Sequence, residues 1–183
     1  MILTLSILPS PVGPLALACD AEGRLRGVSF GEGLSKAMRR EYPDAVQIEG
    51  ETPAAVQDGL TAYFAGDQAA LHRIPWSLDG ASAGDGFQAR VWKALAEIPA
   101  GLTISYGEMA KRAGEPGAAQ AAGVALNRNP IAVVLPCHRV VGAGGAMVGF
   151  GGGLGRKTWL LRHQGALLLW SLDSCNPEVT CNP

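Results

Sequence analysis

The sequence places a nucleophile directly beside a base. Cys137 and His138 are adjacent, and both follow an apolar, β-branched run at residues 133–135 and Pro136. Such a run predicts a buried strand, which Pro136 stops because proline has no N–H to donate. A strand end would hold the sulfur still while the following turn leaves it open to a substrate. A free thiol with a pKa of about 8.5 is only slightly ionised at neutral pH, so a nucleophilic cysteine needs such a neighbour.

The same pair also fits a purely structural role, with Cys137 as a small core residue and His138 on the surface, because free cysteine is among the most buried residue types. The cysteines and histidines show no zinc-ligand spacing, so we expect neither a metal nor a cofactor. A reactive Cys137 would have to stay reduced, which predicts a cytoplasmic, nucleoid-associated protein. The four cysteines are Cys19, Cys137, Cys175 and Cys181.

Charge is distributed unevenly along the 183 residues, although the net charge is only −1. Residues 1–84 carry 6 Lys and Arg against 10 Asp and Glu, a balance of −4, whereas residues 85–170 carry 9 against 4, a balance of +5. The basic half is the one that contains Cys137. This asymmetry indicates either a nucleic-acid partner or a solvated basic face.

The apolar start of the chain does not predict a signal peptide or a membrane span. No Lys or Arg precedes it, and Pro9, Pro11 and Pro14 would break the helix of a signal peptide. No stretch reaches 18 unbroken apolar residues, the length needed for a helical span. We therefore expect no membrane partner.

The first half predicts a small α/β unit over residues 1–80, with a mainly antiparallel sheet and helices. Short apolar runs at 2–8, 15–19 and 25–30 alternate with turn residues, which is typical of a hairpin or meander. Residues 34–42 and 53–65 predict helices, and residues 71–74 predict a further strand. No catalytic constellation occurs there, so this unit is expected to support the second half.

The second half predicts a mainly α domain over residues 87–168, after a linker at 81–86. Helices are expected at 87–98, at 105–113 behind a Ser105-x-x-Glu108 capping box, and at 117–127. The last two form a helix-turn-helix, and the second of them is almost entirely Ala and Gly. So slim a helix fits either a narrow minor groove or tight packing on a neighbouring helix. The Cys137 strand, a hairpin at 140–148, a helix at 154–163 and a disordered tail at 169–183 complete the prediction.

Six short motifs give the second half a specific likeness to one family. From about residue 87 to 165 the chain resembles the O6-alkylguanine-DNA alkyltransferases, also called methylated-DNA-protein-cysteine methyltransferases, whereas the first 80 residues fit that family loosely. The motifs, in chain order, are Ile98-Pro99-Ala100-Gly101, Ser105-Tyr106-Gly107-Glu108, Asn129-Pro130, Pro136-Cys137-His138-Arg139-Val140, Gly149-Phe150-Gly151-Gly152-Gly153 and Arg156-Lys157-Thr158-Trp159-Leu160-Leu161.

The resemblance implies a single-turnover enzyme of DNA repair. It would be a monomer that binds double-stranded DNA containing an alkylated guanine and moves the alkyl group onto its own cysteine. The implied alkyl acceptor is Cys137, with His138 as its base through a bridging water, Tyr106 as hydrogen-bond donor to the departing guanine and Asn129 as a structural hinge. The implied contacts are Phe150, Gly151 and Val140 with the base, and Ala118, Ala119, Gln120, Ala122 and Arg128 with DNA.

Two positions depart from the family pattern. Gln164 stands where the family usually has a Glu that holds the histidine, and Gln120 stands where it usually has an Arg that fills the gap left by the flipped base. An amide oxygen at Gln164 would still accept the imidazole N–H but carries no charge, which predicts a slower thiol. Gln120 predicts a weaker hold on DNA, which Arg128 would offset only if the helix shifts. Arg139 is expected to form an internal salt bridge.

Two other functions remain open from the sequence. One is a base-flipping protein that binds alkylated guanine without transfer, against which the presence of Cys137 argues. The other is a Cys-His enzyme that acts on a small alkylated molecule and keeps the helix-turn-helix as scaffold, which the departure at Gln120 leaves open.

Overall fold

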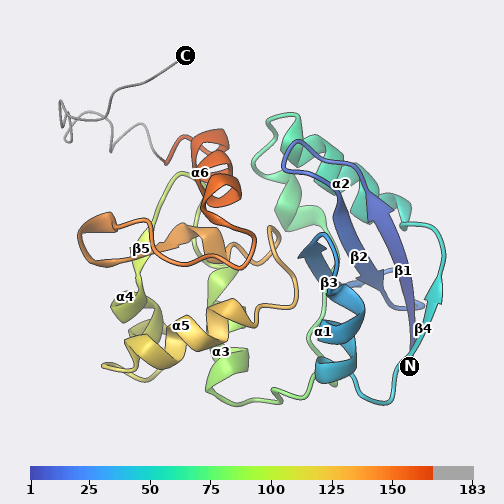
Figure 1. Cartoon of the computed structure of the whole chain (residues 1–183), viewed down its shortest axis with the longest axis horizontal. Helices are drawn as coiled ribbons and strands as arrows, with labels where there is room; N and C mark the ends of the chain where they lie inside the picture. The colour runs from blue at the N-terminus through green and yellow to red at the C-terminus, as the bar shows by residue number, and fades with distance from the viewer. Residues whose placement is uncertain (167–183) are drawn as a thin grey trace.

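The computed structural model describes residues 1–166, and its first half is built on a four-stranded sheet (Figure 1). The strands are β1 (Ile2–Leu8), β2 (Leu15–Cys19), β3 (Leu25–Phe30) and β4 (Val46–Glu49). Their order in the sheet is β3-β2-β1-β4. Strand β2 pairs antiparallel with both β1 and β3, and β4 pairs parallel with β1. The three predicted strands are confirmed at their predicted bounds. The fourth is a short, largely exposed edge strand that the sequence analysis did not predict.

Helices cover both faces of this sheet. Helix α1 (Leu34–Glu41) packs with Met38 against Leu3 and Ala18, and α2 (Ala54–Phe64) joins the main core through Leu60 and Tyr63. The strand predicted at residues 71–74 is wrong, because most of this stretch lies within a 3₁₀ helix, η1 (Ala70–Arg73), packed against α2. A local turn at the preceding aspartate starts it, and a three- or four-residue apolar run cannot distinguish the two structures by its periodicity.

The second half is mainly helical, as predicted. Ser105 accepts a hydrogen bond from the Glu108 amide at 3.1 Å, which confirms the predicted helix start, and α4 and α5 pack together as the helix-turn-helix. Trp92 of α3 donates to the carbonyl of Ala125 in α5 at 2.8 Å. The elements are α3 (Phe87–Leu95), β5 (Ile104–Ser105), α4 (Tyr106–Arg112), α5 (Ala119–Asn127), η2 (Cys137–Arg139), β6 (Val140–Val141), η3 (Ala143–Gly145) and α6 (Leu154–His163).

The predicted hairpin at residues 140–148 is wrong in its pairing. Strand β6 is only two residues long and pairs in parallel with β5, so its partner comes from before the helix-turn-helix and not from the residues that follow. The chain after β6 turns back at once, because the Gly142 amide donates to the Ala146 carbonyl at 2.8 Å.

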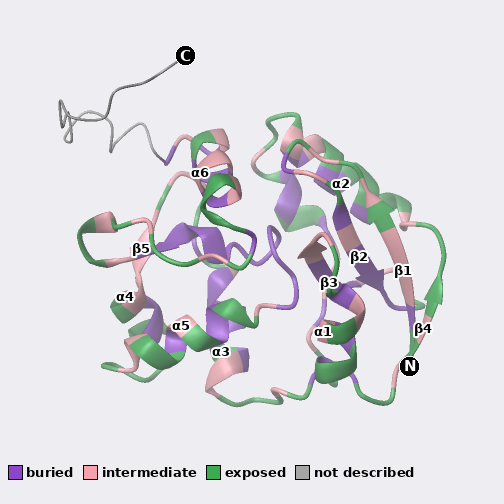
Figure 2. Ribbon diagram, viewed as in Figure 1, coloured by how far each residue is buried: buried purple, intermediate pink, exposed green. Residues whose placement is uncertain are grey.

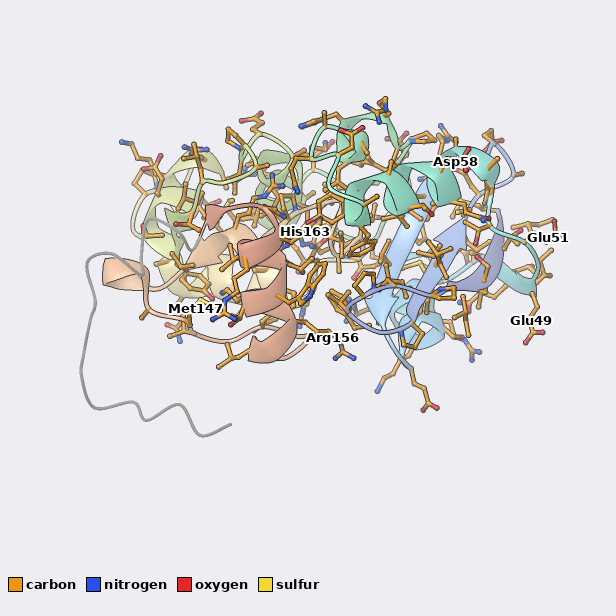
Figure 3. All side chains as sticks on the ribbon, turned by 90° about the horizontal axis from the view of Figure 1, so that it is seen from above. Glu49, Glu51, Asp58, Met147, Arg156 and His163 are labelled. Carbon is orange, nitrogen blue, oxygen red and sulfur yellow. The ribbon has the colours of Figure 1, made fainter. Side chains whose placement is uncertain are left out.

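The two halves share one hydrophobic core, and buried positions run along β2 and β3 and into the segment between α5 and α6 (Figure 2). The free edge of β3 is covered by that segment, since the Val28 amide donates to the Pro130 carbonyl at 2.8 Å and Val28 bridges to Ile131. Helix α6 adds further ties: Arg156 donates to the Val12 carbonyl, and the His163 ring lies 2.7 Å from the Tyr63 carbonyl. Figure 3 shows the side chains of Arg156 and His163 pointing from α6 toward the first half of the chain.

Among residues 1–166, no helix is long and apolar enough to cross a membrane. The tail predicted to be disordered at residues 169–183, with Cys175 and Cys181, lies outside the described residues.

Candidate active site

Cys137 is positioned by a tight turn rather than by a strand. Residues 133–135 are buried as predicted, but they form turns, and Cys137 opens the 3₁₀ helix η2. The Leu135 amide donates back to the Ile131 carbonyl at 2.9 Å, and Val133 has a positive φ of 71°, which is rare for a β-branched residue. The predicted strand is therefore wrong, because pairing of Ile131 with β3 forces the chain to turn before an extended run can form.

Asn129 closes this turn from both sides. Its side-chain amide donates to the Leu135 carbonyl at 2.8 Å, and its side-chain oxygen accepts from the Ile131 amide at 3.1 Å. These bonds tie the end of α5 to the residues just before Cys137. The arrangement fits the hinge role that the resemblance implies for Asn129.

Cys137 is only 9% exposed and lies at the wall of a cavity of about 230 Å³. Burial raises its pKa, while the Asn129 amide and the positive charge of Lys157 act in the opposite direction. Lys157 is itself buried, and its ammonium donates to the carbonyls of Val140 and Val148 at 2.7 and 3.1 Å. Lys157 falls within one of the family motifs, but nothing local in the sequence indicates that its charge lies near the thiol.

The cavity brings together part of the predicted site. Among the predicted residues, Asn129, Arg128, Phe150 and Gly151 line it with Cys137. The first half of the chain contributes lining residues that the sequence analysis missed: Val28, Ser29, Phe30, Glu32, Leu34, Ala37 and Arg40. A larger groove of about 770 Å³ lies over β1 and α1, but neither cysteine nor histidine lines it, so it is no candidate for this chemistry.

Helix α5 carries its small residues on two different faces. Ala122 is fully buried, so the DNA contact implied for it does not fit: this alanine packs inside the core. Ala118 and Ala119 are half-buried, and Gln120 is exposed. A Cβ at Gly123 would lie 3.6 Å from the Tyr106 ring, an ordinary van der Waals contact, so this face of the helix packs closely against α4.

Tyr106, the first residue of α4, is half-buried close to the nucleophile. Burial raises the pKa of its hydroxyl, and the charge of the Cys137 thiolate raises it further. Val140, by contrast, is fully buried, and its carbonyl already accepts from Lys157. Val140 does not line the cavity, so the base contact implied for it has no support in this arrangement.

His138 is fully buried and held by Gln164, which ends α6. The side-chain nitrogen Nε2 of Gln164 lies 2.6 Å from Nε2 of His138, so an amide nitrogen, and not the predicted amide oxygen, faces the imidazole. The oxygen is taken by Arg139, whose Nε donates to it at 2.8 Å and whose Nη1 donates to the Ile98 carbonyl. Arg139 therefore makes no salt bridge within residues 1–166, contrary to expectation.

The other imidazole nitrogen of His138, Nδ1, is buried without a hydrogen-bond partner in the described part of the chain. Burial, together with the positive charges of Arg139 and Lys157, lowers the pKa of His138 from 6.5 to about 3. The imidazole is thus neutral at physiological pH. Among residues 1–166, no three His, Cys, Asp or Glu side chains gather in a group that could hold a metal ion.

Comparison with known proteins identifies the family of this chain. The family described as 6-O-methylguanine DNA methyltransferase, DNA binding domain, matches residues 86–166. Methylated-DNA-protein-cysteine methyltransferases of Shigella flexneri and Methanosarcina acetivorans are 41% and 45% identical, each aligned over 88% of this chain and over 95% and 97% of their own lengths. The crystal structure of Mycobacterium tuberculosis OGT in complex with DNA is similar with a TM-score of 0.70 and 37% identity, covering 91% of this chain and 94% of that one. The resemblance is confirmed: the chain belongs to the methylated-DNA-protein-cysteine methyltransferase family.

Proposed function

We propose that this protein repairs O6-alkylguanine in double-stranded DNA by direct transfer of the alkyl group to Cys137, once per molecule. The observation that carries the proposal is the cavity at Cys137, which is lined by Phe150 and Gly151 and adjoins the end of α5. A base swung out of the duplex needs such a recess next to the reacting atom. Membership of the family supports the same reaction.

The reaction is a single displacement at carbon. The Cys137 thiolate attacks the alkyl carbon, the new S–C bond forms as the C–O6 bond breaks, and the electron pair leaves with the guanine. The guanine then takes up one proton, which restores the normal base. A thioether is a very poor leaving group, so the thiol is not regenerated and the stoichiometry is one.

The surrounding groups have distinct roles in this proposal. Lys157 and the Asn129 amide stabilise the thiolate, since both oppose the effect of burial on the thiol pKa. Tyr106 supplies a hydroxyl near the sulfur that donates a hydrogen bond or proton to the departing guanine. Phe150 and Gly151 form the wall against which the flipped base rests.

DNA is bound through the helix-turn-helix. Ala118, Ala119 and the exposed Gln120 lie at the start of α5, which supports their contact with the minor groove, and exposed Arg128 lies where α5 meets the cavity. The protein acts as a monomer in a reducing, nucleoid-containing compartment. Residues 1–80 form the supporting domain and residues 87–168 the transferring domain, joined through 81–86.

Intact-mass measurement tests the proposal. The full chain is incubated with a duplex oligonucleotide that contains one O6-methylguanine, and one methyl gain is expected, located on Cys137 by peptide mapping. Cys137→Ala should gain nothing, while Cys19→Ala should react like the unaltered protein, because burial and the Asp20 charge raise the Cys19 pKa to about 12.

Two other outcomes would overturn the proposal. Tight binding of the duplex without a mass change would indicate a lesion-binding protein. Reaction with a free small alkyl donor, but not with DNA, would indicate an enzyme of small molecules.

A further inference from the structure

The Gln164 amide sits among three polar groups at the inner end of α6. Its oxygen accepts from Arg139 Nε at 2.8 Å, and its nitrogen lies 2.6 Å from both Tyr63 Oη and His138 Nε2. All four side chains are buried. Water therefore cannot replace a bond that the amide fails to make, and each buried polar atom needs a partner of the right kind.

Arg139 decides which way this amide points. A guanidinium has only donors, so the group that faces it must be the amide oxygen. The NH₂ group then has two hydrogens and two neighbours, Tyr63 Oη and His138 Nε2. The reversed amide would set an NH₂ group against the guanidinium and leave Arg139 Nε without an acceptor, at the cost of an unpaired buried donor.

A nitrogen that accepts a hydrogen bond from an amide carries no proton of its own. In neutral imidazole one nitrogen is a donor and the other an acceptor. If Nε2 accepts from Gln164, the single ring proton lies on Nδ1. With a carboxylate at position 164 the polarity would be the opposite, because a carboxylate only accepts and would require the proton on Nε2.

We propose that Arg139 is a positioning residue: through the Gln164 amide it holds His138 as the Nδ1–H tautomer, so that the imidazole has no free lone pair at Nδ1 and does not take the thiol proton. This inference deepens the proposed function and rests on it. Arg139 touches neither the sulfur nor the base, and it acts only through the amide.

The charges around His138 agree with this assignment. The titratable or charged groups that face the imidazole or its partners are Arg139 and Lys157, both positive, together with Tyr63 and Cys137. Both cations oppose an imidazolium, and the burial of the ring opposes it too. The thiol proton therefore passes to water before the S–C bond forms, and the thiolate is stabilised by the Lys157 charge and the Asn129 amide.

Nitrogen NMR of the histidine rings tests the tautomer without any DNA. The full-length, unalkylated protein is prepared with ¹⁵N-labelled histidine, and the His138 ring is identified by the loss of its signals in His138→Asn. We expect a pyrrole-type shift for Nδ1 and a pyridine-type shift for Nε2. A protonated Nε2 in the unaltered protein would overturn the proposal.

Two variants test the cause of the tautomer. Gln164→Glu should move the ring proton to Nε2 and raise the single-turnover alkylation rate at neutral pH on the order of 100-fold, because Nδ1 then becomes a general base. The pH profile of the unaltered protein should show only the thiol ionisation, while that of the variant gains a second one. An unchanged tautomer in Gln164→Glu would refute the proposal.

Arg139→Met removes the donor that fixes the amide and keeps an unbranched stem. If it folds, we expect mixed tautomers at His138, and a pure Nδ1–H form would show that Arg139 is not the cause. If it does not fold, the spectra of the unaltered protein and Gln164→Glu decide the matter. Failure of alkyl transfer with an intact Nδ1–H tautomer would count against the proposed function alone.

Discussion

Mild acid is expected to destabilise this protein through His138. The ring is fully buried, and burial together with the charges of Arg139 and Lys157 lowers its pKa from 6.5 to about 3. In the unfolded chain a histidine has a pKa of about 6.5. Between pH 6.5 and 3 the unfolded state therefore binds one proton more than the native state, so the free energy of unfolding falls as the pH falls.

The size of the effect follows from that one proton. A full proton difference changes the free energy of unfolding by about 1.4 kcal/mol per pH unit. Since the unfolded histidine is already partly protonated at pH 6, the loss between pH 6 and 4.5 is about 2 kcal/mol. Such a loss is large against a typical total of about 5–15 kcal/mol. Hydrogen bonds from Arg24 and Arg26 lower the pKa of Asp20 despite its burial, so Asp20 adds its own loss of stability only below about pH 4.

Urea unfolding followed by far-ultraviolet circular dichroism, at a series of pH values from 6.5 to 4.5 under reducing conditions, measures this loss. The matched variant is His138→Asn, which stays polar but does not titrate. Its absolute stability will differ, so only the slopes against pH are compared. Equal slopes for the two proteins would show that His138 is not a buried neutral group, and the reasoning about its surroundings would fail.

Three further changes test other parts of the site and the fold. Asn129→Ala removes two hydrogen bonds around the Cys137 turn and should cost about 1–3 kcal/mol of stability and slow alkylation, as measured by urea unfolding and mass assays. Gln57→Ala, which shortens an exposed amide side chain on α2 that does not line the cavity, should do neither. Gln120→Arg should tighten binding to duplex DNA and steepen the dependence of log K on log salt by about 0.9, measured by fluorescence anisotropy; an unchanged slope would remove α5 from the interface. Gly59→Ala should lower the melting temperature through a loss of about 1–3 kcal/mol, because a Cβ there would overlap the Ile74 side chain.

Sequence patterns predicted the elements whose partners lie nearby along the chain. Strands β1 to β3 were predicted at their bounds because each apolar run is closed by turn residues and pairs with its neighbour in sequence. Helix α6 was predicted equally well, since Gly153 and Gly165 mark its ends. Strand β4 was missed because its side chains are mostly exposed, and because its partner in the sheet, β1, lies more than 40 residues earlier.

The segment before Cys137 was mispredicted for the opposite reason. A buried, β-branched run normally extends, but here Ile131 and Ala132 already complete the edge of β3 through bonds to Val28. Residues 133–135 have no further strand to pair with, so the chain turns there and their side chains are buried in the core. The sequence pattern predicts that residues 133–135 are buried, but it does not predict which distant strand lies beside them.

Which nitrogen of the His138 ring donates and which accepts could not be predicted from the sequence, for a related reason. Knowing that Gln164 replaces a carboxylate indicates the loss of a charge, and the simplest expectation is that the amide oxygen takes over the same hydrogen bond. The side chains that decide otherwise are Arg139, 25 residues earlier, and Tyr63, 101 residues earlier. Because one demands an acceptor and the other takes a donated hydrogen, the amide is left with only an N–H to offer His138. The substitution therefore reverses the direction of the hydrogen bond at the imidazole. Besides removing a charge, it should change which group takes the thiol proton.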